Sequence, residues 1–124
     1  MKLLLALLTL LGVSLFFAQN PPEKNPGLTL RRDGHWLVIE GKHLPDGELR
    51  INYLEAYCRA NSTDADWVKH TVINHKCEPI SLSDDGKTMK LRDTLTDGVI
   101  VDHTITAGTD EVTFELTAHN PTSK

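Results

Sequence analysis

The chain lacks any run of basic residues, and its overall charge is acidic. It carries 13 Lys and Arg against 17 Asp and Glu in 124 residues, a formal net charge of −4 at pH 7. Nucleic acids and anionic membranes are bound through clustered positive charge, because phosphate groups dominate their surfaces. We therefore expect neither nucleic acid nor an anionic membrane to be the main partner.

Cysteine is also scarce: the chain has two, Cys58 and Cys77, and they form no Cys-x-x-Cys pair. If residues 48–58 and 67–77 pair as a hairpin, Cys58 lies opposite Trp67, and the two sulfurs are roughly 30 Å apart at the usual rise of a strand. A disulfide needs Cα atoms within about 7 Å. The hairpin and a disulfide between these cysteines therefore exclude each other, and we favour two free, buried thiols.

Metal-binding and catalytic motifs are absent as well. The six histidines form no His-x-His or His-Glu-x-x-His motif. His70 and His75 are five positions apart, an odd spacing that places them on opposite faces of a strand. The chain has no Gly-x-Ser-x-Gly motif and no glycine-rich phosphate loop. We expect no metal and no cofactor.

Long apolar runs are confined to the first 18 residues, which hold eight leucines and one charge, Lys2. The apolar stretch at 3–17 is shorter than the ~20 residues that a membrane-spanning helix needs. A short positive start followed by such a stretch is typical of a secretory signal peptide. We expect a signal peptide at 1–18, export to the periplasm or cell exterior, and membrane contact only if this leader stays uncleaved. Residues 19–27 contain three prolines and are predicted to be a linker.

Turn signals dominate the rest of the chain. Asp-Gly occurs four times, at 33–34, 46–47, 85–86 and 97–98. Asp-Gly between apolar runs is a strong hairpin signal, because glycine tolerates the positive φ that the turn requires. The segments between these turns predict an all-β, antiparallel β-sandwich in one domain at 28–124, with about seven strands at 28–31, 35–40, 48–58, 67–77, 88–95, 99–106 and 111–118.

Apolar and polar residues alternate in the last strands, which indicates a sheet with one wet face. The pattern is cleanest at 111–118, and in 88–95 it is broken by Asp93. No closing strand is predicted after 118, so we expect the last strand to be an exposed edge, which invites pairing with another segment or chain. The alternative is a partial chain, which would end in the same way. One segment is ambiguous: 49–60 also fits a helical stripe. Residues 62–66 could begin a single helical turn, with Ser62 as its cap.

The hairpin register places Glu55 opposite His70, among apolar neighbours. A carboxylate that faces an imidazole in such surroundings could be a tuned acid–base pair. The alternatives are a structural ion pair or a different register, because a slip by one residue sends His70 to the other face.

The polar loop at 59–66 ends in Trp67 and is a second candidate site. Loops between strands often carry ligand sites, and Trp or Tyr can stack on the apolar face of a sugar ring. The alternative is that the aromatic residues are needed in the core, because the mature chain has only five. The candidate binding residues from both sites are Glu55, Tyr57, Arg59, Trp67 and His70.

Residues 82–121 resemble part of the galactose-mutarotase-like β-supersandwich group, through the turn at 82–86, the strands at 91–95 and 110–116, and Asp97-Gly98-Val99. Residues 52–59 with Asp66-Trp67 resemble uncharacterised exported bacterial proteins of the same kind. The resemblance implies the N-terminal part of a sugar-related supersandwich, with no catalytic residue of the group in this chain. We expect a carbohydrate-binding module or the front part of a carbohydrate-active protein. The alternatives are an Ig-like domain that pairs through an edge strand, and an enzyme that uses Glu55 and His70.

Overall fold

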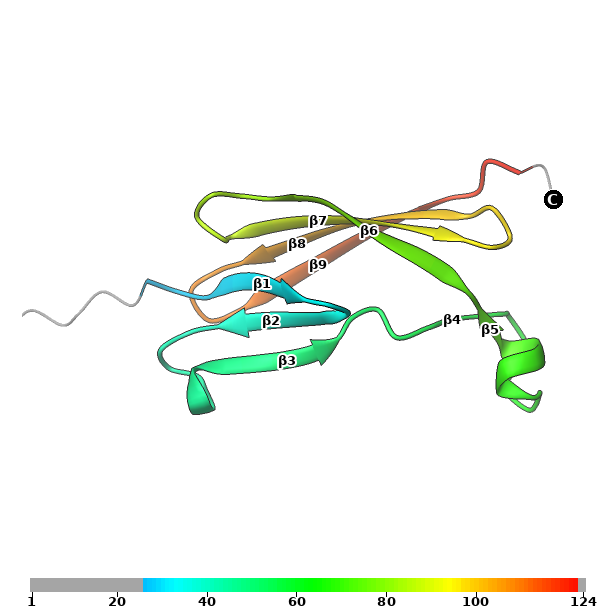
Figure 1. Cartoon of the computed structure of the whole chain (residues 1–124), viewed down its shortest axis with the longest axis horizontal. Coiled ribbons are helices and arrows are strands. Elements are labelled where there is room, and N and C mark those ends of the chain that lie inside the picture. The colour runs from blue at the N-terminus through cyan, green and yellow to red at the C-terminus, as the bar shows by residue number, and fades with distance from the viewer. Residues whose placement is uncertain (1–25, 123–124) are drawn as a thin grey trace, which may run out of the picture.

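A computed structural model describes residues 26–122 (Figure 1). The predicted signal peptide at 1–18 and nearly all of the predicted linker at 19–27 lie outside the described residues. Within the described part, no helix is long and apolar enough to cross a membrane.

The described residues form antiparallel sheets, in the orders β1–β2–β3, β4–β5 and β6–β7–β8–β9. The strands are β1 (Thr29–Asp33), β2 (Trp36–Glu40), β3 (Glu48–Asn52), β4 (Tyr57–Cys58), β5 (Val72–Ile73), β6 (His75–Leu82), β7 (Thr88–Leu95), β8 (Ile100–Ala107) and β9 (Val112–His119). Two single-turn helices are η1 (Pro45–Gly47) and η2 (Trp67–Thr71). The predicted all-β, sandwich-like class is confirmed.

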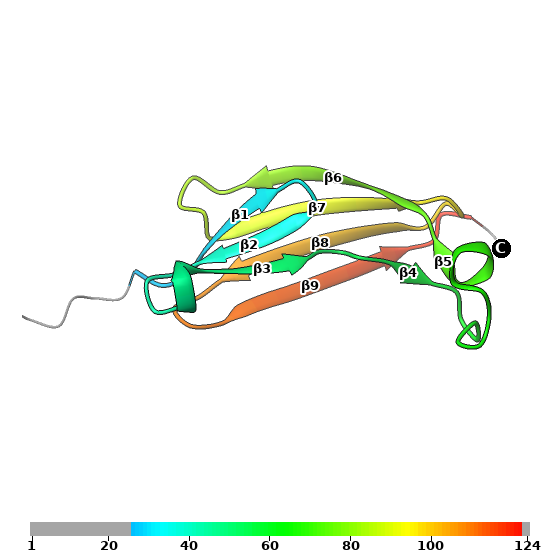
Figure 2. The same cartoon turned by 60° about the horizontal axis from the view of Figure 1, so that its bottom comes forward.

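The two larger sheets pack face to face, with the three-stranded sheet over one half of the four-stranded sheet (Figures 1 and 2). The short β4–β5 pair and η2 lie at the opposite end. Alternate residues of β7 and β8 point into the interior, as the sequence pattern predicts. The main core joins side chains from both sheets: Leu28, Leu30, Leu37, Ile39, Tyr53, Met89, Leu91, Ile105 and Ala107. A smaller cluster near the β4–β5 pair contains Ile73, Leu95 and Val101.

The predicted hairpin between 48–58 and 67–77 is wrong, and so is the helical alternative for 49–60. Residues 48–52 form β3, which pairs with β2, so that Leu49 lies opposite Ile39. This pairing lets Ile51 pack against the main core, a contact that favours β2 as the partner. The chain then leaves the sheet, and only Tyr57 and Cys58 pair with β5.

The predicted strand at 67–77 begins instead with the helix η2, and the residue that caps it is Asp66 rather than Ser62. The Asp66 carboxylate accepts a hydrogen bond from the Lys69 backbone N–H at 2.8 Å, which satisfies a donor that the helix start leaves free. Ser62 donates to the Arg59 carbonyl oxygen instead.

Both cysteines are free, as predicted. Their expected burial is only partly correct, because Cys77 is half-buried and Cys58 is exposed. Cys58 belongs to a pair of strands only two residues long.

Candidate functional site

Four polar side chains meet in the interior, where the segment after β3 crosses the four-stranded sheet. We call Tyr53, Tyr57, Asp93 and His103 the buried polar cluster. The Asp93 and His103 side chains are each only 1% exposed. Both lie on the inward faces of their strands, and Leu91, the neighbour of Asp93 on its face of β7, is the register partner of His103. Asp93 and His103 are therefore diagonal neighbours on adjacent strands.

His103 lies at the centre of the hydrogen bonds of the cluster. The Tyr53 hydroxyl lies 2.8 Å from Nδ1 of His103. Nε2 of His103 lies 3.1 Å from Oδ2 of Asp93 and 3.0 Å from the Tyr57 hydroxyl. With a proton on Nε2, the imidazole donates to Asp93 and accepts from the Tyr53 hydroxyl at Nδ1. Tyr57 donates to the same Asp93 oxygen at 2.7 Å.

Both tyrosines keep their protons at neutral pH. Burial raises the pKa of Tyr53 to about 12, and the Asp93 charge adds to the effect. Burial also raises the pKa of Tyr57, and so does its hydrogen bond to Asp93. Both hydroxyls can therefore donate hydrogen bonds within the cluster at neutral pH.

Cys77 borders the cluster from β6, directly opposite Asp93. Burial raises the pKa of the Cys77 thiol, the Asp93 carboxylate raises it further, and Arg32 opposes both effects. The Arg32 guanidinium donates from Nη1 to Sγ at 3.2 Å. Since the nucleophilic form of cysteine is the thiolate, Cys77 is placed as a weakly reactive thiol.

A histidine held between a carboxylate and a hydroxyl has the groups needed for acid–base chemistry. A general acid or base must, however, come within about 2.6–3.2 Å of the substrate proton. The His103 side chain is 1% exposed, and both of its ring nitrogens are occupied by protein groups. In this arrangement the cluster attaches the segment at 53–57 to the four-stranded sheet.

The five sequence-predicted residues lie on residues 55–73, which we call the end cap; its elements β4, β5 and η2 form one end of the molecule (Figure 2). Glu55 and His70 are both exposed. No ion pair or hydrogen bond joins their side chains within the described residues, and the strand register that placed them opposite each other is wrong. His70 lies in η2 rather than on a strand.

The other three predicted residues differ in exposure. Tyr57 is half-buried, and its ring packs edge-on against His75 at 5.0 Å between centroids. Arg59 is exposed, and its backbone N–H donates to the Thr71 carbonyl at 2.9 Å. Trp67, the first residue of η2, is 54% exposed. The end cap thus brings Arg59 and η2 together, whereas the hydroxyl of Tyr57 is directed into the buried polar cluster.

Sequence reasoning missed Asp93 and His103 as interacting residues, although a signal was present. Asp93 occupies an apolar-face position between Leu91 and Leu95, and His103 occupies the same kind of position between Val101 and Ile105. The interruption of the pattern at Asp93 therefore marked an inward-facing carboxylate, which must find donors in the interior.

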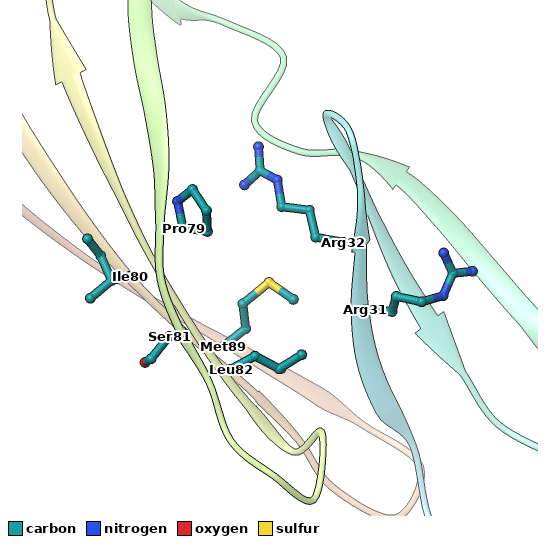
Figure 3. A pocket seen from close by; sticks show the side chains of 7 residues that line it. All are labelled: Arg31, Arg32, Pro79, Ile80, Ser81, Leu82 and Met89. Atoms are coloured by element: carbon teal, nitrogen blue, oxygen red, sulfur yellow. The ribbon is translucent and has the colours of Figure 1, made fainter.

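A shallow groove of about 350 Å³ lies between β1 and β6 (Figure 3). Arg32 extends toward Pro79 on one side of it, while the Arg31 guanidinium is turned away and pairs with Glu40 and Glu48. The groove is lined by Arg31, Arg32, Pro79, Ile80, Ser81, Leu82 and Met89.

No group of three or more His, Cys, Asp or Glu residues within 26–122 could hold a metal ion. Comparisons with protein-family models, curated proteins and solved structures found no match to this chain. The resemblance to the galactose-mutarotase-like group therefore stays a prediction, and function has to be argued from the geometry.

Proposed function

We propose that this chain is an exported β-sandwich module that binds carbohydrate through its end cap. The observation that carries the proposal is the exposure of Trp67. The other aromatic side chains of the described residues, Trp36, Tyr53, Tyr57 and Phe114, are buried or half-buried, whereas Trp67 is 54% exposed. An indole ring left open in a domain with few aromatics is available to stack on a sugar ring.

Polar groups beside Trp67 support a sugar ligand rather than a purely apolar one. Lys69 and His70 follow it in η2, and Arg59 is hydrogen-bonded through its backbone to Thr71 at the end of that helix. All three polar side chains are exposed. They offer donors to sugar hydroxyl groups at the margin of the aromatic surface.

The end cap is held in shape by its own hydrogen bonds. Asp66 caps η2 at Lys69, and the Thr71 hydroxyl donates to the Ser62 carbonyl at 2.9 Å. A surface ordered before binding loses less conformational entropy when the ligand arrives. The predicted signal peptide and the family resemblance agree with an extracellular or periplasmic sugar ligand, and the proposal needs no metal or cofactor.

Fluorescence of Trp67 tests the proposal. In a Trp36→Phe background Trp67 is the sole indole, so soluble glycans should shift its emission and reduce its quenching by acrylamide. Trp67→Ala should abolish retention on the same glycans in a polysaccharide pull-down. Val68→Ala is the matched control, because Val68 is the next residue and is 76% exposed.

Failure across a broad glycan array, with folded protein confirmed by circular dichroism, would overturn the proposal. Glycan binding that survives Trp67→Ala would also overturn it, because the site would then lie elsewhere.

A further inference from the structure

Strand β9 is an open edge of the four-stranded sheet. It pairs with β8 over eight consecutive residue pairs without a register shift, and no strand pairs with its other side in the described part of the chain. Gly108 donates to the Glu111 carbonyl in this register. By the alternation of an antiparallel ladder, the even-numbered residues from Val112 to Ala118 direct their backbone N–H and C=O groups outward.

The opposite edge of the same sheet, β6, carries the devices that prevent pairing. Pro79 interrupts its row of donors, and the register shifts between Pro79 and Ser81. Proline and bulges are common means by which edge strands avoid association. Strand β9 has neither feature, so its outward N–H and C=O groups form an uninterrupted row with which another strand can pair.

The inward face of β9 is also incompletely covered. Leu116 lies opposite the buried His103 in the register, yet it is 50% exposed. Leu49, on the edge strand β3 of the other sheet, is 52% exposed. Figure 2 shows β3 and β9 along the same side of the molecule. Apolar side chains on both sheets are thus left open beside the free edge.

We propose that β9 pairs antiparallel with β9 of a second copy of this chain, with Thr117 opposite Thr117 on the two-fold axis. In this register Glu115 of each copy lies opposite His119 of the other, and Leu116 lies opposite Ala118. Threonine pairs favour cross-strand association, and an imidazole opposite a carboxylate can donate a hydrogen bond to it. A register shifted by two residues toward Val112 would instead oppose the two Glu115 side chains, which is unfavourable.

The choice of a second copy follows from this complementarity, because one short strand supplies both members of each favourable pair. A C2 contact of this kind is self-complementary by symmetry. It would join two four-stranded sheets into one and bring the Leu49 and Leu116 side chains of both copies toward a shared boundary. The inference is independent of the carbohydrate proposal, since the end cap takes no part in it.

Sedimentation analysis over a concentration series tests the pairing. We expect the unmodified chain to dimerise and Thr117→Lys to be monomeric, because two lysines would then face each other on the axis. Thr113→Lys is the matched control, since Thr113 is also exposed on the outer face of β9 but lies beyond the central pairs. A chain that stays monomeric at all concentrations would overturn the proposal. Stronger dimerisation of Thr117→Lys would overturn this register, because the lysine would then face Glu115.

Charge exchange gives a readout that a general loss of stability would not reproduce. Glu115→Lys and His119→Glu should each weaken the dimer by about ten-fold or more, since two pairs are lost at once. The double variant should restore it. In a Cys58→Ser background, Thr117→Cys should form an intermolecular disulfide on mild oxidation, because paired Cα atoms lie about 4.5–5.5 Å apart. No rescue and no cross-link would both contradict the proposal.

Discussion

Tyr53→Phe removes one hydroxyl group from the buried polar cluster and leaves the aromatic ring in place. The ring packs against His103 and Phe114 with centroid distances of 5.5 and 5.4 Å, and Phe can keep both contacts. Nδ1 of His103 loses its donor, which lies at 2.8 Å, in a site where the imidazole is 1% exposed. A buried acceptor left without a partner costs about 1–3 kcal/mol. For a domain of this size, 1 kcal/mol corresponds to about 4–8 °C in Tm.

Urea unfolding followed by circular dichroism measures the loss, and the slope m should stay constant because the surface exposed on unfolding hardly changes. Trp67→Ala is the control, since an exposed side chain should change the free energy of unfolding by no more than about 0.5 kcal/mol. A loss below that value for Tyr53→Phe would refute the claim that Nδ1 depends on Tyr53.

A double-mutant cycle separates this hydrogen bond from ring packing. In a His103→Leu background the acceptor is gone, so Tyr53→Phe should cost little beyond the desolvation of a hydroxyl that no longer has a partner. We expect a coupling free energy of about 1 kcal/mol or more between the two positions. Additive losses would mean that the hydroxyl and the imidazole stabilise the fold independently.

Three further predictions concern pH, thiol reactivity and packing. Because the pKa of Tyr53 is raised to about 12 from an ordinary value near 10, its contribution to stability is complete below pH 10 and falls as the pH rises toward 12, by at most about 1.4 kcal/mol per pH unit; urea midpoints across this range should fall less steeply for Tyr53→Phe. Cys58 should react with Ellman's reagent in the native state much faster than Cys77, because Cys58 is exposed and the pKa of Cys77 is raised; equal rates would contradict the placement of Cys77. Ile105→Ala should lower the free energy of unfolding by about 2–5 kcal/mol, since Ile105 is fully buried, and calorimetry should show the corresponding fall in Tm.

The parts of the fold that sequence could predict are those fixed by local chemistry. Gly34, Gly86 and Gly98 all have positive φ, as Asp-Gly turns require. The strands predicted at 88–95, 99–106 and 111–118 agree with β7, β8 and β9 to within one residue. Their period-two patterns are clear because one face of each strand is buried and the other meets water.

The region from 48 to 77 could not be predicted because its pairing depends on distant contacts. Residues 48–52 could pair with the strand that precedes them in the sequence or with the segment at 67–77 that follows them. Only the packing of Ile51 against the main core favours β2, the preceding strand. The helix η2 begins at the cap that Asp66 forms, within a sequence that also fits a strand. Tertiary contacts commonly decide between local alternatives of similar stability.

The buried polar cluster shows the same limit for the candidate site. The inward positions of Asp93 and His103 follow from strand alternation, but their partners do not. Tyr53 lies 50 residues before His103 in the chain, and it reaches Nδ1 only because residues 53–57 cross the four-stranded sheet after β3 ends. No pattern within a strand could indicate this contact.

The buried polar cluster also fixes the position of the end cap relative to the four-stranded sheet. An apolar replacement of the four residues could be as stable, because buried polar groups must repay their desolvation. Apolar contacts, however, would allow residues 53–57 to shift along the sheet, whereas the three hydrogen-bond contacts of Tyr53 and Tyr57 have fixed directions and favour one position. Tyr57 both donates to Asp93 and begins β4, so the cluster sets the start of the segment that carries Arg59 and Trp67. Tyr57 is the one cluster residue that also belongs to the end cap. Tyr57→Phe should therefore lower both the free energy of unfolding and the affinity of the end cap for carbohydrate.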